Sequence, residues 1–434
     1  MAQQTIDIFF AAIQAVDPRR AVEGYIPHIL STYKYGGFYK LLLVSFGKAA
    51  FLMTKAVFDN ACDLIARGII ITKYGHAQSA EFPTSIEVYE AGHPIPDKNG
   101  VEATRKAMAM LKDADEKTLV LCLVSGGGSA LLVSPKDGIS LDDKRALTDL
   151  LLKAGASISE LNTVRKHISE VKGGMLAYCA YPARLISLIL SDVIGDKLDV
   201  IASGPTSPDS TTYQMALEVI KKYSLLDRLP NTVRDILISG TEGRIADTPK
   251  ERDAIFARVE NIIVGSNKKA ALTAEEKAKE LGFNTKILST DLQGEAKDVA
   301  RWLAKKAIEA KKTLKGKEGR KICLISGGET TVNVKGNGKG GRNTELALAF
   351  ALEVADTQGI TLLSAGTDGT DGPTDAAGAI VTGETIQKAR LLNLDPSAYL
   401  RNNDSYSFFS KTGELLVTAP TGTNVMDLQI MLIS

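Results

Sequence analysis

The chain has 434 residues, of which 44% are hydrophobic and 24% are charged. A single hydrophobic core rarely extends over so long a chain, so we expect two or three domains, and the composition is that of a chain that folds fully. Lys and Arg number 52 against 51 Asp and Glu, and this balance excludes an overall field that would draw the protein to nucleic acid or to an anionic membrane.

The chain begins with a segment, residues 1–22, that has the apolar spacing of an amphipathic helix and lacks the basic and apolar regions of a signal peptide. The longest apolar runs, such as LVLCLV at 119–124, are far too short to span a bilayer. The cysteines and histidines are too widely spaced to indicate a disulfide framework or a zinc site. These features predict a cytoplasmic protein without a nucleic-acid or membrane partner, and they leave open whether it forms a homodimer.

Short aliphatic runs alternate along the chain with longer helical segments. The runs lie at residues 40–46, 68–72, 118–125, 184–191, 260–266, 321–326 and 360–366. Near-continuous apolar strands separated by helices predict parallel sheets that are covered on both faces. We therefore expect an α/β protein of two domains, the first Rossmann-like with a mostly parallel sheet and the second a smaller α/β domain in which a mixed sheet is also allowed.

We place the domain boundary in the polar stretch at 239–254, which combines Gly, Pro and charge as linkers do. The predicted domains are 1–245 and 246–434, with the last roughly 25 residues able to pack back on the first domain, and the active site is expected in the cleft between them. A weak internal sequence similarity favours two domains, because LCLVSGGGSALL at 121–132 resembles ICLISGGETTVN at 322–333. Chance similarity between buried strands that are followed by glycine turns explains this observation equally well.

The first glycine-rich loop is SGGGS, which comprises Ser125, Gly126, Gly127, Gly128 and Ser129 and follows a predicted strand. Ligands of open α/β sheets bind beyond the carboxyl ends of the strands, and glycines let backbone N–H groups approach an anion. We therefore predict a cradle for a phosphate or carboxylate here. A simple tight turn is the alternative, although such a turn does not require three glycines.

Two further glycine-rich loops lie in the second half of the chain. SGGET contains Gly327, Gly328 and Glu329, and KGNGKGGRN contains Gly338, Gly340 and Arg342. The second loop matches G-x-G-x-x-G, which is weak by itself, but its interleaved cations suit a phosphate or a carboxylate. We predict that both loops bind substrate or phosphate, and a disordered basic loop is the alternative.

Single charged residues complete the predicted chemistry. Asp368 and Asp371 stand in the loop SAGTDGTDGPTD and suit the magnesium of a nucleotide, although Asp is also an ordinary turn former. Asp192 lies at a strand end as the candidate base for a substrate hydroxyl, and Lys48 follows the first strand, where it can meet a migrating phosphoryl group. Neither a P-loop nor the protein-kinase signatures surround these residues.

Two other polar segments are interpreted as structural. His93, in the loop EAGHPIPDKNG, is expected to support a rigid connection and not the chemistry. The predicted helix NTVRKHISEVKGGMLA places Arg165, Lys166, His167 and Lys172 near its polar face, and we expect that face to be solvated.

Several of these motifs together resemble the glycerate 2-kinase family, whose C-terminal half is the MOFRL domain. The motifs are SFGKAA, GHPIPD, SGGGSALL, NTVRKHIS-x-x-KGG, SDVIGD followed by IASGPT, SGGETTVNV, GGRN, SAGTDGTDGPTDAAG and NDSYSFF. The resemblance implies ATP-dependent phosphorylation of D-glycerate at its 2-hydroxyl to 2-phosphoglycerate, with Mg²⁺, and it places the family's catalytic residues on Lys48, Asp192 and Arg342. The chain departs from the family pattern at Met175, Thr344 and Met426.

The residues leave two other functions open. An oxidoreductase acting on hydroxypyruvate would explain the G-x-G-x-x-G match, but a nicotinamide fingerprint should open a βαβ unit and precede an acidic residue by about 20 positions, whereas this loop is crowded with cations. A regulator that binds a phosphorylated metabolite would use the same loops without turnover, and no DNA-binding motif supports it. A kinase with ATP, Mg²⁺ and D-glycerate as its ligands is therefore the preferred interpretation.

Overall fold

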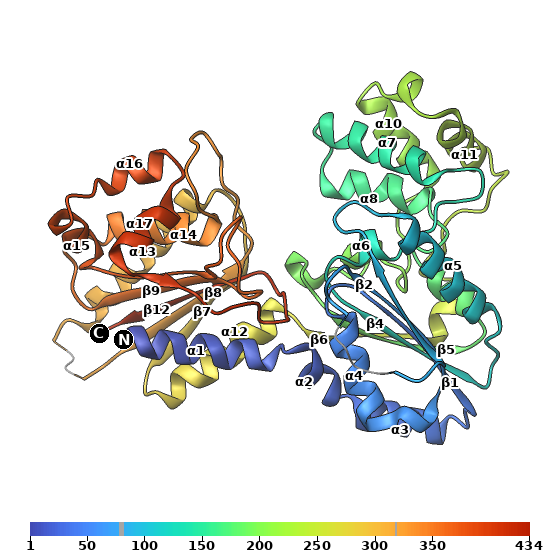
Figure 1. Cartoon of the computed structure of the whole chain (residues 1–434), viewed down its shortest axis with the longest axis horizontal. Coiled ribbons are helices and arrows are strands. Elements are labelled where there is room, and N and C mark those ends of the chain that lie inside the picture. Colours follow the sequence, from blue (N-terminus) through green and yellow to red (C-terminus); the bar gives the residue numbers. More distant parts are fainter. Residues whose placement is uncertain (78–81, 317–318) are drawn as a thin grey trace. The chain divides into compact units, whose positions relative to one another are not determined.

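The protein forms two compact units, which we call the parallel-sheet unit and the mixed-sheet unit. The structure, a computed structural model, describes residues 1–77, 82–316 and 319–434. The parallel-sheet unit comprises residues 18–191 and 196–264, and the mixed-sheet unit comprises residues 1–17, 192–195 and 265–434. The elements of each unit are labelled in Figure 1.

The parallel-sheet unit is built on six strands in the order β3-β2-β1-β4-β5-β6. All pairs from β3 to β5 are parallel, and the two central strands β1 and β4 are buried along almost their whole length, as strands covered on both faces should be. The strands are β1 (Lys40–Phe46), β2 (Ile65–Lys73), β3 (Ile86–Ala91), β4 (Thr118–Val124), β5 (Arg184–Leu190) and β6 (Val259–Gly265).

Helices cover both faces of this sheet. The connections through α4 and α5 cross the sheet in opposite directions, and because parallel crossovers are right-handed these two helices lie on opposite faces. The helices near the sheet are α2 (Pro18–Glu23), α3 (Ile26–Tyr35), α4 (Ala50–Ala61), α5 (Lys98–Lys112), α6 (Gly128–Leu131) and α9 (Met175–Ala180).

Four helices of the parallel-sheet unit form a small core of their own, and they gather in one group in Figure 1. They are α7 (Leu141–Lys153), α8 (Ile158–His167), α10 (Tyr213–Lys222) and α11 (Asn231–Thr241). Leu147, Val164, Ile220 and Leu237 supply one apolar residue from each helix to this core. Helices α7 and α8 both begin with a serine whose hydroxyl accepts the N–H three residues later, so their N-termini are capped locally.

The mixed-sheet unit contains a second six-stranded sheet, in the order β11-β10-β9-β12-β8-β7. Strands β7 and β8 are parallel, whereas β12 is antiparallel to both of its neighbours and β10 is antiparallel to β9 and β11. The strands are β7 (Asn284–Leu292), β8 (Ile322–Gly328), β9 (Ile360–Gly366), β10 (Gly378–Thr382), β11 (Leu415–Leu416) and β12 (Asp427–Ile433).

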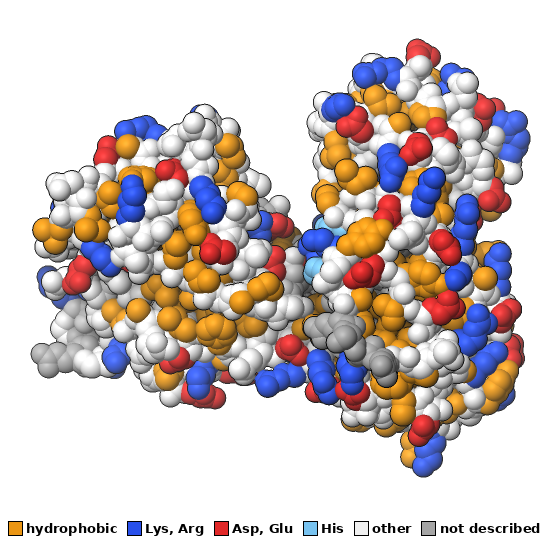
Figure 2. All heavy atoms as spheres, viewed as in Figure 1, with side chains coloured by type: hydrophobic (Ala, Val, Ile, Leu, Met, Phe, Trp, Pro, Cys, Tyr) orange, Lys and Arg blue, Asp and Glu red, His pale blue; other side chains and the backbone are white. Residues whose placement is uncertain are grey.

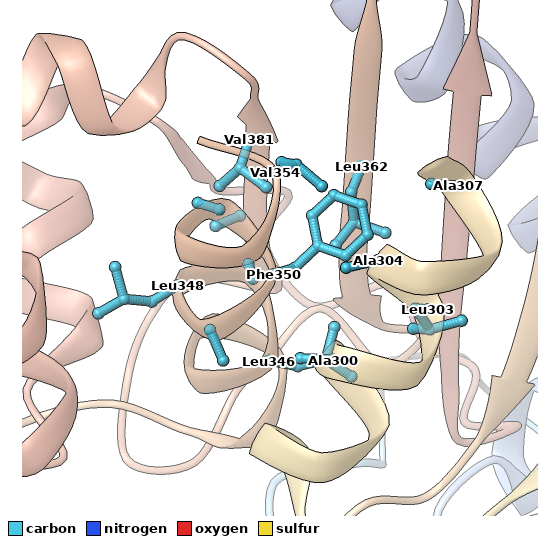
Figure 3. Close-up of a cluster of buried hydrophobic side chains, with 14 of the residues drawn as sticks. Ala300, Leu303, Ala304, Ala307, Leu346, Leu348, Phe350, Val354, Leu362 and Val381 are labelled. Atoms are coloured by element: carbon cyan, nitrogen blue, oxygen red, sulfur yellow. The ribbon is translucent and has the colours of Figure 1, made fainter. Parts of the chain in front are cut away.

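Figure 1 shows α1 and α12 on one face of this sheet and α13 and α14 on the other. Figure 3 shows the core on the second face, where the Phe350 ring of α14 lies beside Ala304 of α13 and Leu362 of β9. The helices are α1 (Ala2–Ala15), α12 (Asn267–Glu280), α13 (Ala296–Leu314), α14 (Arg342–Glu353), α15 (Thr385–Leu391), α16 (Pro396–Arg401) and α17 (Ser405–Thr412). Short 3-10 turns lie at Cys62–Leu64, Ile194–Asp196, Ile201–Ser203, Leu226–Arg228 and Ala254–Arg258.

The predicted fold class is confirmed, with a parallel sheet in one unit and a mixed sheet in the smaller one. The strands expected at 40–46 and 360–366 have those bounds as β1 and β9. The four cysteines are free, as expected.

The units divide the chain differently from the predicted 1–245 and 246–434. Strand β6 extends the parallel sheet, so the division falls at 264/265. The N-terminal helix α1 belongs to the mixed-sheet unit, because it buries Ile8 and Phe9 where it packs on α12 and the sheet. The last residues form β12 in the centre of the mixed sheet. The stretch at 239–254 is no free linker, because Thr248 donates to the buried Asp209 at 2.9 Å.

Basic and acidic side chains are interspersed over the face shown in Figure 2, in keeping with the balanced composition. Among the helices of the described ranges, none combines the length and the apolar character that crossing a membrane requires.

Candidate active site

Lys48 and the SGGGS loop are brought together by the parallel pairing of β1 and β4. Phe46 and Val124 are register partners at the carboxyl ends of these strands, so the loops that follow lie side by side. The N–H of Ser125 donates to the Phe46 carbonyl at 3.1 Å, and the N–H of Lys48 donates to the Gly126 carbonyl at 2.9 Å. The Ser125 hydroxyl in turn accepts the N–H of Ala49 at 3.0 Å. These bonds hold the Lys48 backbone against the loop, as the strand-end argument predicted.

The SGGGS loop carries backbone donors without protein acceptors. Among the hydrogen bonds of the described residues, none has the N–H of Gly126, Gly127 or Ser129 as its donor. Gly127 adopts the left-handed conformation with φ +84°, which turns the loop back into the short helix α6. Successive N–H groups in such a turn form a concavity that binds anions. The structure thus provides the donors that the predicted phosphate or carboxylate cradle needs.

His93 lies against this loop, which sequence reasoning missed. A Cβ atom built on Gly127 would be 3.0 Å from His93 Cδ2 and 3.3 Å from Lys48 Cγ, so the ring and the lysine stem flank the same glycine. Burial, together with the charges of Lys48, Lys73 and His76, lowers the pKa of His93 to about 4. The imidazole is therefore neutral near pH 7 and can donate or accept a hydrogen bond at the loop.

The polar residues of α8 are buried, so the expectation of a solvated helix face is wrong. Lys166 is 2% exposed and His167 is fully buried, because α7, α10 and the loop before β6 cover this face, while Arg165 is partly exposed. Lys172, which lies in the segment after α8, is also fully buried. Lys166 forms an ion pair with the buried Asp209 at 3.1 Å, and His167 Nε2 lies 2.9 Å from Asp247 Oδ1. The pattern of charges along one helix did not show which distant carboxylates would meet them.

Arg342, the first residue of α14, is held by carboxylates of the mixed-sheet unit. Its Nε and Nη2 atoms donate to the two oxygens of Asp427 at 2.6 and 2.9 Å, and its Nη1 atom lies 2.9 Å from Glu329 Oε1. Burial raises the pKa of Asp427 to about 6 although Arg342 opposes the shift. The Asp427 side chain is fully buried, whereas that of Glu329 is 47% exposed. Asp427 therefore fixes the guanidinium, and Glu329 is the partner that a ligand can replace.

A cavity of about 730 Å³ in the mixed-sheet unit joins several predicted residues, since Glu329, Gly338, Gly340 and Arg342 all line it. Thr330 also lines it, and the buried Oγ1 atom of Thr330 has no hydrogen-bond partner in the described part of the chain. A buried hydroxyl of this kind usually finds a partner, and a bound ligand can supply one.

The glycines of the basic loop are needed for close packing, and their binding of substrate or phosphate stays a prediction. A Cβ atom on Gly338 would lie 2.3 Å from Asp404 Cβ, and one on Gly340 would lie 2.4 Å from Ser405 Oγ. The Gly338 N–H donates to the Asn402 carbonyl at 3.0 Å, and the Asn403 side chain accepts the N–H groups of residues 335 and 336. The loop is thus tied to the segment 402–405, and most of its donors are occupied.

Close packing also explains the two glycines of the SGGET motif. Gly327 and Gly328 are strand residues of β8, paired with β12, and not loop residues. A Cβ atom on Gly327 would lie 2.1 Å from Asn267 Oδ1, whose amide group donates to the carbonyls of residues 425 and 427. These glycines are needed for the close approach of Asn267 and of β7, and of this motif only Glu329 and Thr330 line the cavity.

The two predicted metal ligands differ in the structure. Asp371 is buried, and its oxygens accept the backbone N–H groups of Asn343 and Thr344 at 2.9 and 2.8 Å, so it anchors the start of α14. Both oxygens of Asp371 are thus occupied by the start of α14, and its binding of a metal stays a prediction. Asp368 is partly exposed, and its Oδ1 atom accepts from Thr370 at 3.0 Å. No group of three or more metal-ligating side chains occurs among the described residues.

Asp192 stands two residues beyond β5, as the strand-end argument expected, and is partly buried. It belongs to the mixed-sheet unit with Arg342, while Lys48 belongs to the parallel-sheet unit. That these three side chains act on one metabolite stays a prediction.

Comparison with known proteins places the chain among characterised enzymes. Residues 4–238 match the family described as "Domain of unknown function (DUF4147)", and residues 322–427 match the "MOFRL family". The chain is 46% identical to the D-glycerate 2-kinase of Thermotoga maritima, over 99% of this chain and 97% of that protein. It is 40% identical to a putative hydroxypyruvate reductase of Agrobacterium vitis, over 98% of this chain and 93% of that protein. The crystal structure of a glycerate kinase from Thermotoga maritima matches with a TM-score of 0.90 and 44% identity, covering 100% of this chain and 99% of that chain.

Proposed function

Because this chain belongs to the glycerate 2-kinase family, we propose that it transfers the γ-phosphoryl group of ATP to the 2-hydroxyl of D-glycerate and forms 2-phosphoglycerate. The observation that carries the proposal is the set of unpaired N–H groups in the SGGGS loop directly beside Lys48. Phosphoryl transfer depends on positioning and on stabilising charge, and these are the groups that such a reaction needs.

In this mechanism the N–H groups of Gly126, Gly127 and Ser129 bind an anionic group of a substrate. Lys48 stabilises the negative charge on the migrating phosphoryl group, because its stem lies beside Gly127 and its ammonium group forms no ion pair with the described residues. Asp192 accepts the proton of the attacking hydroxyl, in the role that a carboxylate at a strand end can fill.

The cavity of the mixed-sheet unit supplies the second set of contacts in the proposal. Arg342 stays bound to the buried Asp427 and exchanges the exposed Glu329 for an oxygen of a phosphate or carboxylate. The hydroxyl of Thr330 gains its missing partner from the same ligand. The volume of about 730 Å³ is within the range of small-molecule and cofactor pockets.

The residues of the candidate site can accommodate Mg²⁺ if most of its ligands come from the nucleotide. Mg²⁺ usually binds through one or two carboxylates together with phosphate oxygens and water, and it neutralises charge on the phosphates. Asp368 is the side chain proposed to contact it, because one of its oxygens accepts from Thr370 and the other has no donor among the described residues. In this proposal Asp371 accepts the backbone N–H groups at the start of α14 and does not contact the metal.

Phosphorus NMR of the product tests the proposal. The protein is incubated with ATP, Mg²⁺ and D-glycerate, and the expected spectrum contains ADP and 2-phosphoglycerate. A spectrum with unchanged ATP, or with 3-phosphoglycerate as the sole product, would contradict the proposed reaction.

Reduction of hydroxypyruvate is the second candidate, since the similar Agrobacterium vitis protein carries that name. The loop with the G-x-G-x-x-G match gives it little support, because β8 ends at Gly328, well before the loop, and Asn402 and Asn403 take up the backbone donors. Loss of nicotinamide absorbance on addition of hydroxypyruvate would favour this candidate over the kinase.

A further inference from the structure

Three cations are buried together beneath the SGGGS loop, and we call them the cation cluster: Lys144 of α7, Arg165 of α8 and Lys172 in the segment before α9. Lys144 is 2% exposed and Lys172 is fully buried. The Lys172 ammonium donates to the Ser129 carbonyl at 2.9 Å, and Arg165 Nη2 donates to the same carbonyl at 3.3 Å. The cluster therefore touches the last residue of the loop that carries the free N–H groups.

The cluster has no counter-ion of its own. Among the described residues, no carboxylate forms an ion pair with any of the three, and the buried Nε atom of Arg165 has no hydrogen-bond partner. Lys166, the next residue on α8, shows the contrasting arrangement, because it is equally buried but pairs with Asp209 at 3.1 Å and Asp199 at 3.5 Å. A buried cation with a structural role is thus paired in this fold, and the neighbouring cluster is not.

Leaving three neighbouring cations unpaired is unfavourable in the folded protein. Burial, together with the charge of Arg165, lowers the pKa of Lys144 to about 7, and burial together with both neighbours lowers the pKa of Lys172 well below its ordinary value. Burial also lowers the pKa of Arg165. An anion bound nearby would offset this repulsion, so the fold gains from a negative ligand at this place.

From this geometry we propose that the cation cluster is the counter-charge of an oxyanion-binding site, in which a carboxylate or phosphate group accepts the free N–H groups of Gly126, Gly127 and Ser129. The inference deepens the proposed function, on which it rests for the identity of the ligand. Arg165, the partly exposed member, is the one that reaches the ligand. Lys172 is a positioning residue, because it holds the Ser129 carbonyl, and Lys144 acts only through its charge.

Replacement of Lys144 by Met tests the cluster, with Lys153→Met as the matched control. Both changes remove one positive charge from α7, but the Lys153 side chain is 73% exposed. Anion binding is measured by calorimetry and by the shift of Tm, with sulfate, D-glycerate and a non-hydrolysable ATP analogue as probes. We expect Lys144→Met to weaken sulfate binding at least tenfold while the Tm of the free protein stays level or rises, and Lys153→Met to change neither.

The probes distinguish the two sources of the oxyanion. Weaker binding of D-glycerate alone would assign the cluster to the carboxylate of the acid, and weaker binding of the nucleotide alone would assign it to a phosphate. Unchanged binding of all three probes by Lys144→Met would overturn the inference. The phosphorus NMR assay of the unaltered protein is independent of this result, so the proposed function and the inference can fail separately.

A second measurement needs no variant. Sulfate does not titrate near neutral pH, so any proton taken up when it binds at pH 8 is taken up by the protein. Calorimetry in two buffers of different ionisation enthalpy measures this uptake. The other charged groups on or beside α8 are Lys166 with its partners Asp199 and Asp209 and His167 with Asp247, and Lys48 and His93 lie beside Gly127 of the loop. We expect uptake of a substantial fraction of one proton, because the anion favours the charged form of Lys144. Absence of uptake would overturn the inference.

Discussion

The spacing between Gly127, Lys48 and His93 can be tested by adding one methyl group to the loop. A Cβ atom at Gly127 would lie 3.0 Å from His93 Cδ2 and 3.3 Å from Lys48 Cγ, so both side chains would have to move by a few tenths of an ångström. The left-handed conformation also costs a residue other than glycine roughly 1–2 kcal/mol. We expect Gly127→Ala to lose about that much unfolding free energy and, because small displacements of a catalytic group slow a reaction steeply, roughly tenfold or more in kcat.

Gly138→Ala is the control that separates backbone strain from the contacts. Gly138 has φ +85°, almost the same as Gly127, but a Cβ atom there would meet nothing within 4 Å. Urea unfolding should give a similar loss of stability for both variants, and a coupled assay of ADP release should give reduced kcat only for Gly127→Ala. Wild-type kcat in Gly127→Ala, with the expected loss of stability, would refute the reasoning that the position of Lys48 and His93 at this glycine matters.

The remaining predictions concern Lys48, the proposed catalytic residue, and two buried hydrogen-bond networks. Lys48→Ala should lower kcat by roughly 100-fold or more with little change in KM in steady-state kinetics, and an unchanged kcat would remove Lys48 from the mechanism. Asn403→Ala leaves the N–H groups of residues 335 and 336 without their acceptor and should cost roughly 1–3 kcal/mol in urea unfolding, whereas a loss below about 0.5 kcal/mol would count against the tie between the two segments. Although burial opposes the shift, the hydrogen bonds from His167 and from the Thr248 N–H lower the pKa of Asp247 to about 2. Because the folded pKa lies below the unfolded value of 3.8, the stabilisation is complete above pH 4 and is lost as the pH falls through about 2. Asp247→Asn should therefore remove roughly 1–2 kcal/mol at pH 7, allowing for the part of the side chain that is solvated, and should flatten the acid limb of the unfolding curve.

The candidate site shows where sequence reasoning succeeds and where it stops. Lys48 and SGGGS were identified because each directly follows an apolar strand, and the parallel pairing of β1 and β4 places such positions at one edge of a sheet. The packing role of Gly338 and Gly340 was not predicted, because a glycine looks the same in a sequence whether it serves a ligand or the close approach of another segment. Their packing partners, residues 402–405, come more than 60 positions later in the chain.

Seven of the strands, the N-terminal helix and the positions of the glycine-rich motifs follow from the sequence alone, because hydrophobic periodicity and turn-forming residues act between neighbours in the chain. Strands β3, β7, β10, β11 and β12 were not among the predicted runs. The tertiary structure alone decided which charges are paired. Arg342 meets Asp427 85 positions away, and Lys166 meets Asp209 43 positions away, while within the described residues Arg165 and Lys172 donate only to carbonyl groups of the backbone. A charge is visible in the sequence, but its burial and its counter-ion depend on segments that come together only when the chain folds.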